Sequence, residues 1–275
     1  MLKKLLKYDF LSAFKVWWIA AVTSFGLSFL GGYAVTLIRS PRDLPDVVDS
    51  SAGLMLFISI FSLFAFVTLS EIIILVRYYK NFFTDEGYLT FTLPVKTGNL
   101  INSKLIMGVV VTVSTLIVLA FNICIILGIG FFDKIFNKEF FQYVFEIIDA
   151  VISEFGVYLF VYILEAIVIF ILASAFSLLL MFCCIALASL ITRKGRVATA
   201  IAIYYGVNCV LSFVMEMVMI FGVRGIGIRL EALSDKVLYP TVAVILLAII
   251  LLFGLASVML YTLQYFMVDR KLNLN

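Results

Sequence analysis

The stretch LIMGVVVTVSTLIVLAFNICIILGIGFF, residues 105–132, is long enough to cross a lipid bilayer and contains no charged side chain. A hydrocarbon core about 30 Å thick requires roughly 20 apolar residues in helical conformation. Backbone groups surrounded by lipid have to be hydrogen bonded within the protein, so only helices and closed barrels cross membranes. Because the apolar residues are continuous and do not alternate with polar ones, the stretch predicts a transmembrane helix and excludes a barrel strand.

Five other stretches of the chain share this character. The six predicted spans are residues 16–38, 54–76, 105–132, 160–191, 197–222 and 240–266. Of the 275 residues, 64% are hydrophobic and 13% are charged, a composition that does not suit a water-facing surface. The segments between the spans are too short to form a core of their own. We therefore predict an all-α, polytopic membrane protein with six transmembrane helices in a single domain, residues 1–275.

The distribution of Lys and Arg over the polar segments gives the orientation by the positive-inside rule. The first, third and fifth loops hold seven of these residues together with ten carboxylates. The two tails and the second and fourth loops hold the other thirteen: Lys3, Lys4, Lys7, Lys15, Arg77, Lys80, Lys96, Lys104, Arg193, Lys194, Arg196, Arg270 and Lys271. We predict that both termini are cytoplasmic and that the first span, which is too long for a signal peptide, stays attached.

Two segments next to the spans have the periodicity of amphipathic helices. In the N-terminal one, the apolar positions are Leu2, Leu5, Leu6, Phe10, Ala13, Phe14 and Trp17. This pattern predicts either a helix lying on the inner leaflet or a basic flank of the first span. In the segment 139–155, the polar stripe is Glu139, Gln142, Glu146, Asp149 and Ser153, and the apolar stripe is Phe141, Val144, Phe145, Ile148, Ile152 and Phe155. We expect this segment to pack at the outer interface, with gating or contact with a cationic substrate as the alternative.

Residue types that carry common enzyme chemistry are missing or unsuitably placed. The absence of histidine removes histidine-ligated zinc and the usual serine or cysteine triads. The chain also has no phosphate-binding loop motif for ATP. Four cysteines lie inside predicted spans, and we interpret them as packing residues: Cys124, Cys183, Cys184 and Cys209. We predict that the chain is not an enzyme and holds no metal or cofactor of its own.

Small residues recur at four-residue spacing in two of the spans. They are Ser24, Ser28 and Gly32 in the first span, and Ala198, Ala202 and Gly206 in the fifth. Such faces let helices approach closely in a membrane. We predict helix packing or dimer contacts at these positions.

Three carboxylates lie within spans or at their edges: Glu71, Glu165 and Glu216. A charge at the membrane centre costs roughly 2.5–3.5 kcal/mol on insertion scales, so a buried acid is a candidate for function. Glu71 lies six residues before Arg77 and can pair with it near the inner interface, whereas the other two lie toward the outer ends of their spans. Each is a candidate for a substrate path or for gating, against the alternative of an ordinary interfacial acid.

The loop between the second and third spans is the most specific feature: RYYKNFFTDEGYLTFTLPVKTGNLINSK, residues 77–104. It predicts a short helix that Thr84 caps and Pro94 ends, with Thr97 capping the next helix. Asp85 and Glu86 suit the positive N-terminal end of the short helix. Apolar side chains follow in a segment that faces the cytoplasm: Tyr88, Leu89, Phe91 and Leu93. We expect a protein partner to cover them, with lipid as the alternative.

With these residues the chain resembles the permease subunits of type-two ATP-binding-cassette (ABC) transporters, particularly those of Gram-positive bacteria. The similarity is carried by Tyr79-Lys80-Asn81, Thr84-Asp85-Glu86-Gly87-Tyr88-Leu89, Thr92-Leu93-Pro94 and Ser103-Lys104, and the six-span layout extends it over the whole chain. In such permeases this loop contains a coupling helix that sits in a cleft of a separate ATPase subunit. The resemblance implies that the docking residues are Thr84, Asp85, Glu86, Gly87, Tyr88, Phe91 and Pro94. The short segment 223–239 departs from the family, which commonly has re-entrant helices there.

The resemblance also implies a function and partners. The expected function is a permease in a bacterial plasma membrane that exports a peptide, a lipid or a hydrophobic drug, with ATP and Mg²⁺ bound on the partner ATPase. Six spans make half of such a transporter, so a second permease subunit is expected, in a homodimer or a heterodimer. Membrane lipid is a further partner, and nucleic acid is not expected. Two alternatives stay open: an ion-coupled secondary transporter, and a membrane-embedded enzyme or assembly scaffold.

Overall fold

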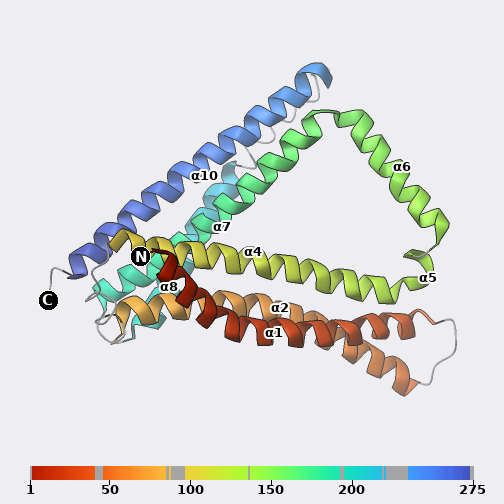
Figure 1. Cartoon of the computed structure of the whole chain (residues 1–275), viewed down its shortest axis with the longest axis horizontal. Coiled ribbons are helices and arrows are strands. Elements are labelled where there is room, and N and C mark those ends of the chain that lie inside the picture. The colour runs from red at the N-terminus through yellow and green to blue at the C-terminus, as the bar shows by residue number, and fades with distance from the viewer. Residues whose placement is uncertain are drawn as a thin grey trace. The chain divides into compact units, whose positions relative to one another are not determined.

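The computed structural model of the protein describes residues 2–40, 46–84, 87, 97–135, 137–192, 195–218, 220 and 235–272. Nearly all of these residues are helical, and none of them lies in a β-strand (Figure 1). The helices are α1 (Leu2–Ile38), α2 (Asp46–Phe83), α4 (Thr97–Gly130), α5 (Phe132–Ile135), α6 (Lys138–Phe155), α7 (Tyr158–Ile191), α8 (Arg196–Val218) and α10 (Asp235–Leu272). The all-α fold predicted from the sequence is therefore confirmed.

Six of these helices are long and apolar enough to cross a membrane. The candidate spans are Leu5–Ile38, Val47–Phe83, Thr97–Gly130, Tyr158–Ile191, Arg196–Met217 and Val237–Asp269. This confirms the six predicted spans. Most of the helices extend past the predicted bounds, and an excess over about 20 residues is accommodated by tilt or by turns that protrude into the interface.

The N-terminal amphipathic segment forms one uninterrupted helix with the first span. Near the span, its apolar face is covered by protein, since Ala13 and Trp17 are buried. Lys3 and Lys7 are exposed. The apolar residues nearest the span therefore contribute to the core of a helix bundle.

The chain folds as two compact units, each built from segments that are separate in the sequence. Unit 1 consists of Met1–Tyr78 and Ile106–Val151, and unit 2 consists of Tyr79–Leu105 and Ile152–Asn275. Helices α2, α4 and α6 each continue from one unit into the other. The sequence predicts a single domain. It does not indicate the division into two units, because the boundaries between the units fall inside helices.

In unit 1, α1 and the adjoining parts of α2 and α4 lie side by side (Figure 1), and buried polar side chains join them. Asn122 accepts a hydrogen bond from the Ser28 hydroxyl at 2.7 Å and donates one to the Ser24 hydroxyl at 3.2 Å. The indole nitrogen of Trp17 donates to the Thr115 hydroxyl at 2.9 Å. These bonds hold α1 to α4, because apolar lipid offers the polar groups no other partner.

Small residues let the helices of unit 1 approach closely. A Cβ atom at Gly32 would lie 2.7 Å from Cβ of Ile129 in α4. A Cβ atom at Gly31 would collide with Ser59 of α2. All three residues of the predicted packing stripe are buried: Ser24, Ser28 and Gly32. The stripe of the first span is thus confirmed as a helix-packing face.

In unit 2, α7 and α10 lie side by side and run in the same direction (Figure 1), as alternate spans of a polytopic chain do. Their contacts keep a constant offset of 77 residues: Tyr162 with Tyr239, Phe176 with Phe253, and Cys183 with Leu260. The constant offset means that the two helices pack without slipping in register along most of their length.

Helix α8 packs on α7 as well, and a short connection joins the two. Gly195 in this connection has a φ of 77°, which glycine adopts without steric cost. The second predicted stripe of small residues is different from the first, because Ala198, Ala202 and Gly206 are all exposed. In the described chain this stripe is therefore not a buried contact between helices. Dimer contacts at these positions stay a prediction.

The interpretation of the cysteines as packing residues holds for two of the four. Cys183 and Cys184 are buried in unit 2, whereas Cys124 and Cys209 are exposed, and all four are free thiols. The buried pair therefore contributes to the contact between helices, and the other two face outward.

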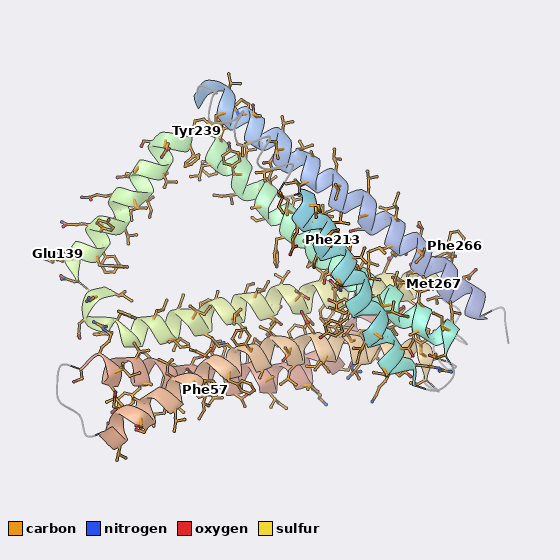
Figure 2. All side chains as sticks on the ribbon, turned by 180° about the vertical axis from the view of Figure 1, so that it is seen from behind. Phe57, Glu139, Phe213, Tyr239, Phe266 and Met267 are labelled. Atoms are coloured by element: carbon orange, nitrogen blue, oxygen red, sulfur yellow. The ribbon has the colours of Figure 1, made fainter. Side chains whose placement is uncertain are left out.

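Large apolar side chains cover much of the described surface. Phe57 of α2, Phe213 of α8 and Phe266 of α10 are 66%, 60% and 65% exposed (Figure 2). Water does not favour such a surface, but the hydrocarbon core of a bilayer does. The surface thus agrees with a multi-pass membrane protein.

Candidate functional site

The loop predicted to dock an ATPase, residues 77–104, is helical at both ends: residues 77–83 are the last part of α2 and residues 97–104 are the first part of α4. Of its seven docking residues, the structure describes Thr84 and Gly87. The remaining five lie outside the described residues: Asp85, Glu86, Tyr88, Phe91 and Pro94. The Thr84 hydroxyl, predicted to cap a new helix, instead donates to the carbonyl of Lys80 at 2.6 Å. It closes the last turn of α2.

Gly87 is buried against the end of α2. Its N–H donates to the carbonyl of Thr84 at 2.8 Å. A Cβ atom at this position would lie 3.1 Å from the carbonyl carbon and oxygen of Phe82, and 3.4 Å from the oxygen of Asn81. These neighbours are backbone atoms that cannot rotate away, so a larger residue has to displace the chain. The start of the loop is therefore seated on the last turn of α2.

This end of the loop is also tied to α8. The guanidinium of Arg196, the first residue of α8, donates to the carbonyl of Phe83 at 3.2 Å. Phe83 is the last residue of α2, where carbonyl groups have no partner within the helix. Arg196 supplies the missing donor and so fixes the exit of α2.

The other end of the loop is tied to α10. The Tyr261 hydroxyl donates to the carbonyl of Gly98 at 3.5 Å and also bonds with the side chain of Asn102. A Cβ atom at Gly98 would lie 3.4 Å from that hydroxyl and 3.9 Å from the ring of Tyr265. Helix α4 comprises Thr97–Gly130, so Gly98 lies in its first turn and Thr97, predicted to cap this helix, is itself helical.

Both ends of the loop are thus held by helices of unit 2. Arg196 of α8 holds the outgoing end and Tyr261 of α10 holds the returning end. Helices α8 and α10 both pack on α7. A displacement of the loop therefore pulls on two helices that share a neighbour.

The three candidate carboxylates lie in different surroundings. Glu71 and Glu216 are exposed, whereas Glu165 is only 6% exposed. Glu71 makes no ion pair with Arg77, although both belong to the described part of the chain. The guanidinium of Arg77 instead donates to the carbonyl of Ser12 at 2.9 Å. Of the three acids, Glu165 alone has the burial that marks a candidate for function.

Glu165 lies close enough to Tyr162 to interact with it electrostatically. Tyr162 belongs to a group of four aromatic residues, here called the aromatic cluster: Phe155, Tyr158, Tyr162 and Tyr239. Tyr158 and Tyr162 precede Glu165 by seven and three residues, which places all three on one face of α7. The Tyr158 ring lies 5.9 Å from the ring of Tyr239, which is labelled in Figure 2. Phe155 lies 6.2 Å from Tyr162 and 5.5 Å from Tyr239 between ring centroids. The cluster thus joins the face of α7 that carries Glu165 to α10.

The amphipathic segment 139–155 is helical, as predicted, and forms most of α6. None of its residues is buried. On its apolar stripe, Phe141, Phe145 and Ile152 are about half exposed or more. Glu139, in its first turn, belongs to the polar stripe (Figure 2). The expected packing at the outer interface stays a prediction.

Sequence reasoning missed the residues that anchor the loop and surround Glu165. In the sequence, Arg196 contributed only to the number of basic residues on the cytoplasmic side. Its position at the start of a helix was the available signal, because a long side chain there can reach the end of a neighbouring helix. Tyr261, Tyr162 and Tyr239 carried no sequence signal, because their partners lie far away along the chain.

Comparison with known proteins adds no further information on identity: no protein-family model, no curated protein and no solved structure matches the chain. The case for a function rests on the chain's own residues.

Proposed function

We propose that the chain is the membrane subunit of an ABC transporter that exports a peptide, a lipid or a hydrophobic drug. ATP and Mg²⁺ are bound by a separate ATPase subunit, and the chain itself performs no catalysis. The segment 84–94 docks on this ATPase and receives its movement. The helices then convert the movement into a change of access to the substrate.

One observation carries this proposal: the docking loop is anchored at both ends to the helices of unit 2. Arg196 binds the carbonyl of Phe83 and Tyr261 binds the carbonyl of Gly98. A loop that only connected two spans would need no such attachment, since loops tolerate variation in length and conformation. A loop that transmits force does need it, because free movement of its ends would dissipate the displacement.

The six spans support a second part of the proposal, namely that the chain acts as half of a transporter. A second permease subunit, identical or similar, completes it. Exposed apolar surface on every membrane-length helix is available both for this subunit and for lipid.

Affinity purification of the full chain from native membranes, followed by mass spectrometry and an ATPase assay, tests the proposal. The test variant is Glu86→Ala with Phe91→Ala. Its matched control is Glu216→Ala with Phe213→Ala, which removes the same two residue types from exposed positions of α8. We expect an ATPase to co-purify with the wild type and the control, and to be lost from the test variant. A wild type that purifies without an ATPase would contradict the proposal.

The buried Glu165 favours a second candidate, an ion-coupled secondary transporter. Such a protein moves its substrate without nucleotide. Reconstitution of the chain alone in liposomes distinguishes the two functions. Uptake driven by a proton or sodium gradient in the absence of ATP supports the second candidate, and uptake that requires the ATPase and ATP supports the first.

A further inference from the structure

Unit 2 contains a buried carboxylate oxygen without a partner. The Oε2 atom of Glu165 is inaccessible and has no hydrogen-bond partner among the described residues. Burying an ionised carboxylate without a partner is very unfavourable, so buried charges in proteins are paired or hold a ligand. The position of Glu165 therefore calls for a positive group.

No described side chain of α7 or α10 supplies this group. Helix α7 contains no Lys or Arg, and α10 has such residues only in its first and last turns. By the offset of 77 residues, Glu165 lies opposite position 242 of α10. The nearest basic position of α10 is residue 236, about 9 Å away at 1.5 Å per residue. Position 242 is a valine, so the residue opposite Glu165 is uncharged.

The aromatic cluster supplies the second half of a cation site. The faces of aromatic rings attract ammonium and guanidinium groups within about 6 Å of the ring centroid. Tyr162 lies close enough to Glu165 for the two to interact electrostatically. A carboxylate beside several rings combines charge pairing with cation–π attraction. Such a site repels an anionic ligand. A neutral ligand is also unfavourable, because the charge of the carboxylate would stay unpaired.

We propose that Glu165 and the aromatic cluster bind an organic cation, through an ammonium or guanidinium group carried by a small molecule or by a basic peptide. This inference rests on the proposed transport function in one respect, that the cation is the transported substrate. Helix α6, which leads into Phe155, carries four carboxylates and a single lysine. The net charge of this helix attracts cations and repels anions.

Equilibrium binding to the full chain, purified without an ATPase and reconstituted in nanodiscs, tests the proposal. The probes are radiolabelled benzyltrimethylammonium and a trilysine peptide, with benzoate as an anionic control. Glu165→Gln removes the charge and keeps the shape. Glu216→Gln is the matched control, since it removes an exposed acid of the same unit. Tyr158→Leu removes a ring of the aromatic cluster that lies 5.9 Å from the ring of Tyr239.

We expect saturable binding of at least one cation by the wild type and none of benzoate. Glu165→Gln should weaken cation binding about tenfold or more, the effect of losing one charge-assisted hydrogen bond. Tyr158→Leu should weaken it less, and Glu216→Gln should leave it unchanged. Binding of the peptide but not of benzyltrimethylammonium identifies a peptide as the source of the cation, and the reverse identifies a small molecule. Thermal unfolding of each variant verifies that it is folded.

Two outcomes overturn the proposal. One is the absence of cation binding by the wild type, or equal binding by wild type and Glu165→Gln. The other is cation binding that appears only when Arg224, Arg229 and Lys236 are changed to glutamine, since one of these residues would then be the natural partner of Glu165. The binding assay contains no ATPase. Its result is therefore independent of the co-purification experiment, in which the absence of an ATPase would contradict the proposed function.

Discussion

The Tyr162 hydroxyl donates a 2.8 Å hydrogen bond to the backbone carbonyl of Tyr239, 77 residues further along the chain. Tyr239 is followed by Pro240, which has no N–H, so this turn of α10 has one hydrogen bond fewer than a regular helix. The bond from Tyr162 therefore joins α10 to α7 directly beside this proline. It also joins two members of the aromatic cluster, one of which, Tyr162, interacts with Glu165.

Tyr162→Phe removes this bond and keeps the ring. We expect the free energy of unfolding to fall by about 0.5–1.5 kcal/mol, the usual net contribution of one hydrogen bond. A lower thermal midpoint of the protein in nanodiscs checks the prediction. Tyr205→Phe is the control, because Tyr205 is 70% exposed. Equal midpoints for the two variants would show that the bond contributes nothing.

Asn122→Leu removes the polar contacts between α1 and α4. Interhelical hydrogen bonds in membranes contribute about 0.6–2 kcal/mol, and the larger apolar side chain also has to fit a fully buried site. We expect unit 1 to loosen at lower temperature. Trp17 reports this through its fluorescence once the second tryptophan is removed as Trp18→Phe.

Asn208→Leu provides the control for this measurement. The amide of Asn208 donates to the carbonyl of Tyr204 within the same helix, so its loss separates no helices. A transition of Asn208→Leu as low as that of Asn122→Leu would contradict the role assigned to the buried amide.

Gly87→Ala places a methyl group 3.1 Å from the backbone of Phe82. Overpacking of this kind costs about 1–3 kcal/mol unless the chain at Gly87 moves away from the end of α2. Under the proposed function, we expect less ATPase to co-purify while the thermal midpoint changes little. Gly206→Ala, which has no atom within 4 Å, should leave both unchanged. If Gly87→Ala recovers as much ATPase as the wild type, close packing of Gly87 on α2 is not required for docking.

Arg196→Gln releases the outgoing end of the docking loop from α8. A hydrogen bond from a charged donor contributes about 1.5–3 kcal/mol, so we expect coupled transport to fall about tenfold or more while ATP turnover persists. Arg196→Lys keeps the charge and should be less affected. Parallel measurement of ATP hydrolysis and transport in proteoliposomes checks this. A proportional loss of both activities would point to impaired assembly and not to impaired coupling.

Some of the structure could be read directly from the sequence, because it depends on local properties. A continuous apolar stretch such as 105–132 has one stable form in lipid, a helix, whatever the rest of the chain does. The same holds for the amphipathic period of 139–155. The packing face formed by Ser24, Ser28 and Gly32 was also predictable, since small residues at four-residue spacing line one side of a helix.

The pairing of distant residues was decided by the tertiary structure alone. The sequence marked Glu71, Glu165 and Glu216 as equal candidates, and only the packing of α7 on α10 buried one of them. It likewise gave no reason to connect Arg196 with Phe83 or Tyr261 with Gly98. Hydropathy specifies which residues avoid water, but in a chain this apolar nearly every helix face does so. Which faces meet is therefore set by side-chain shape and by the few polar groups that need a partner.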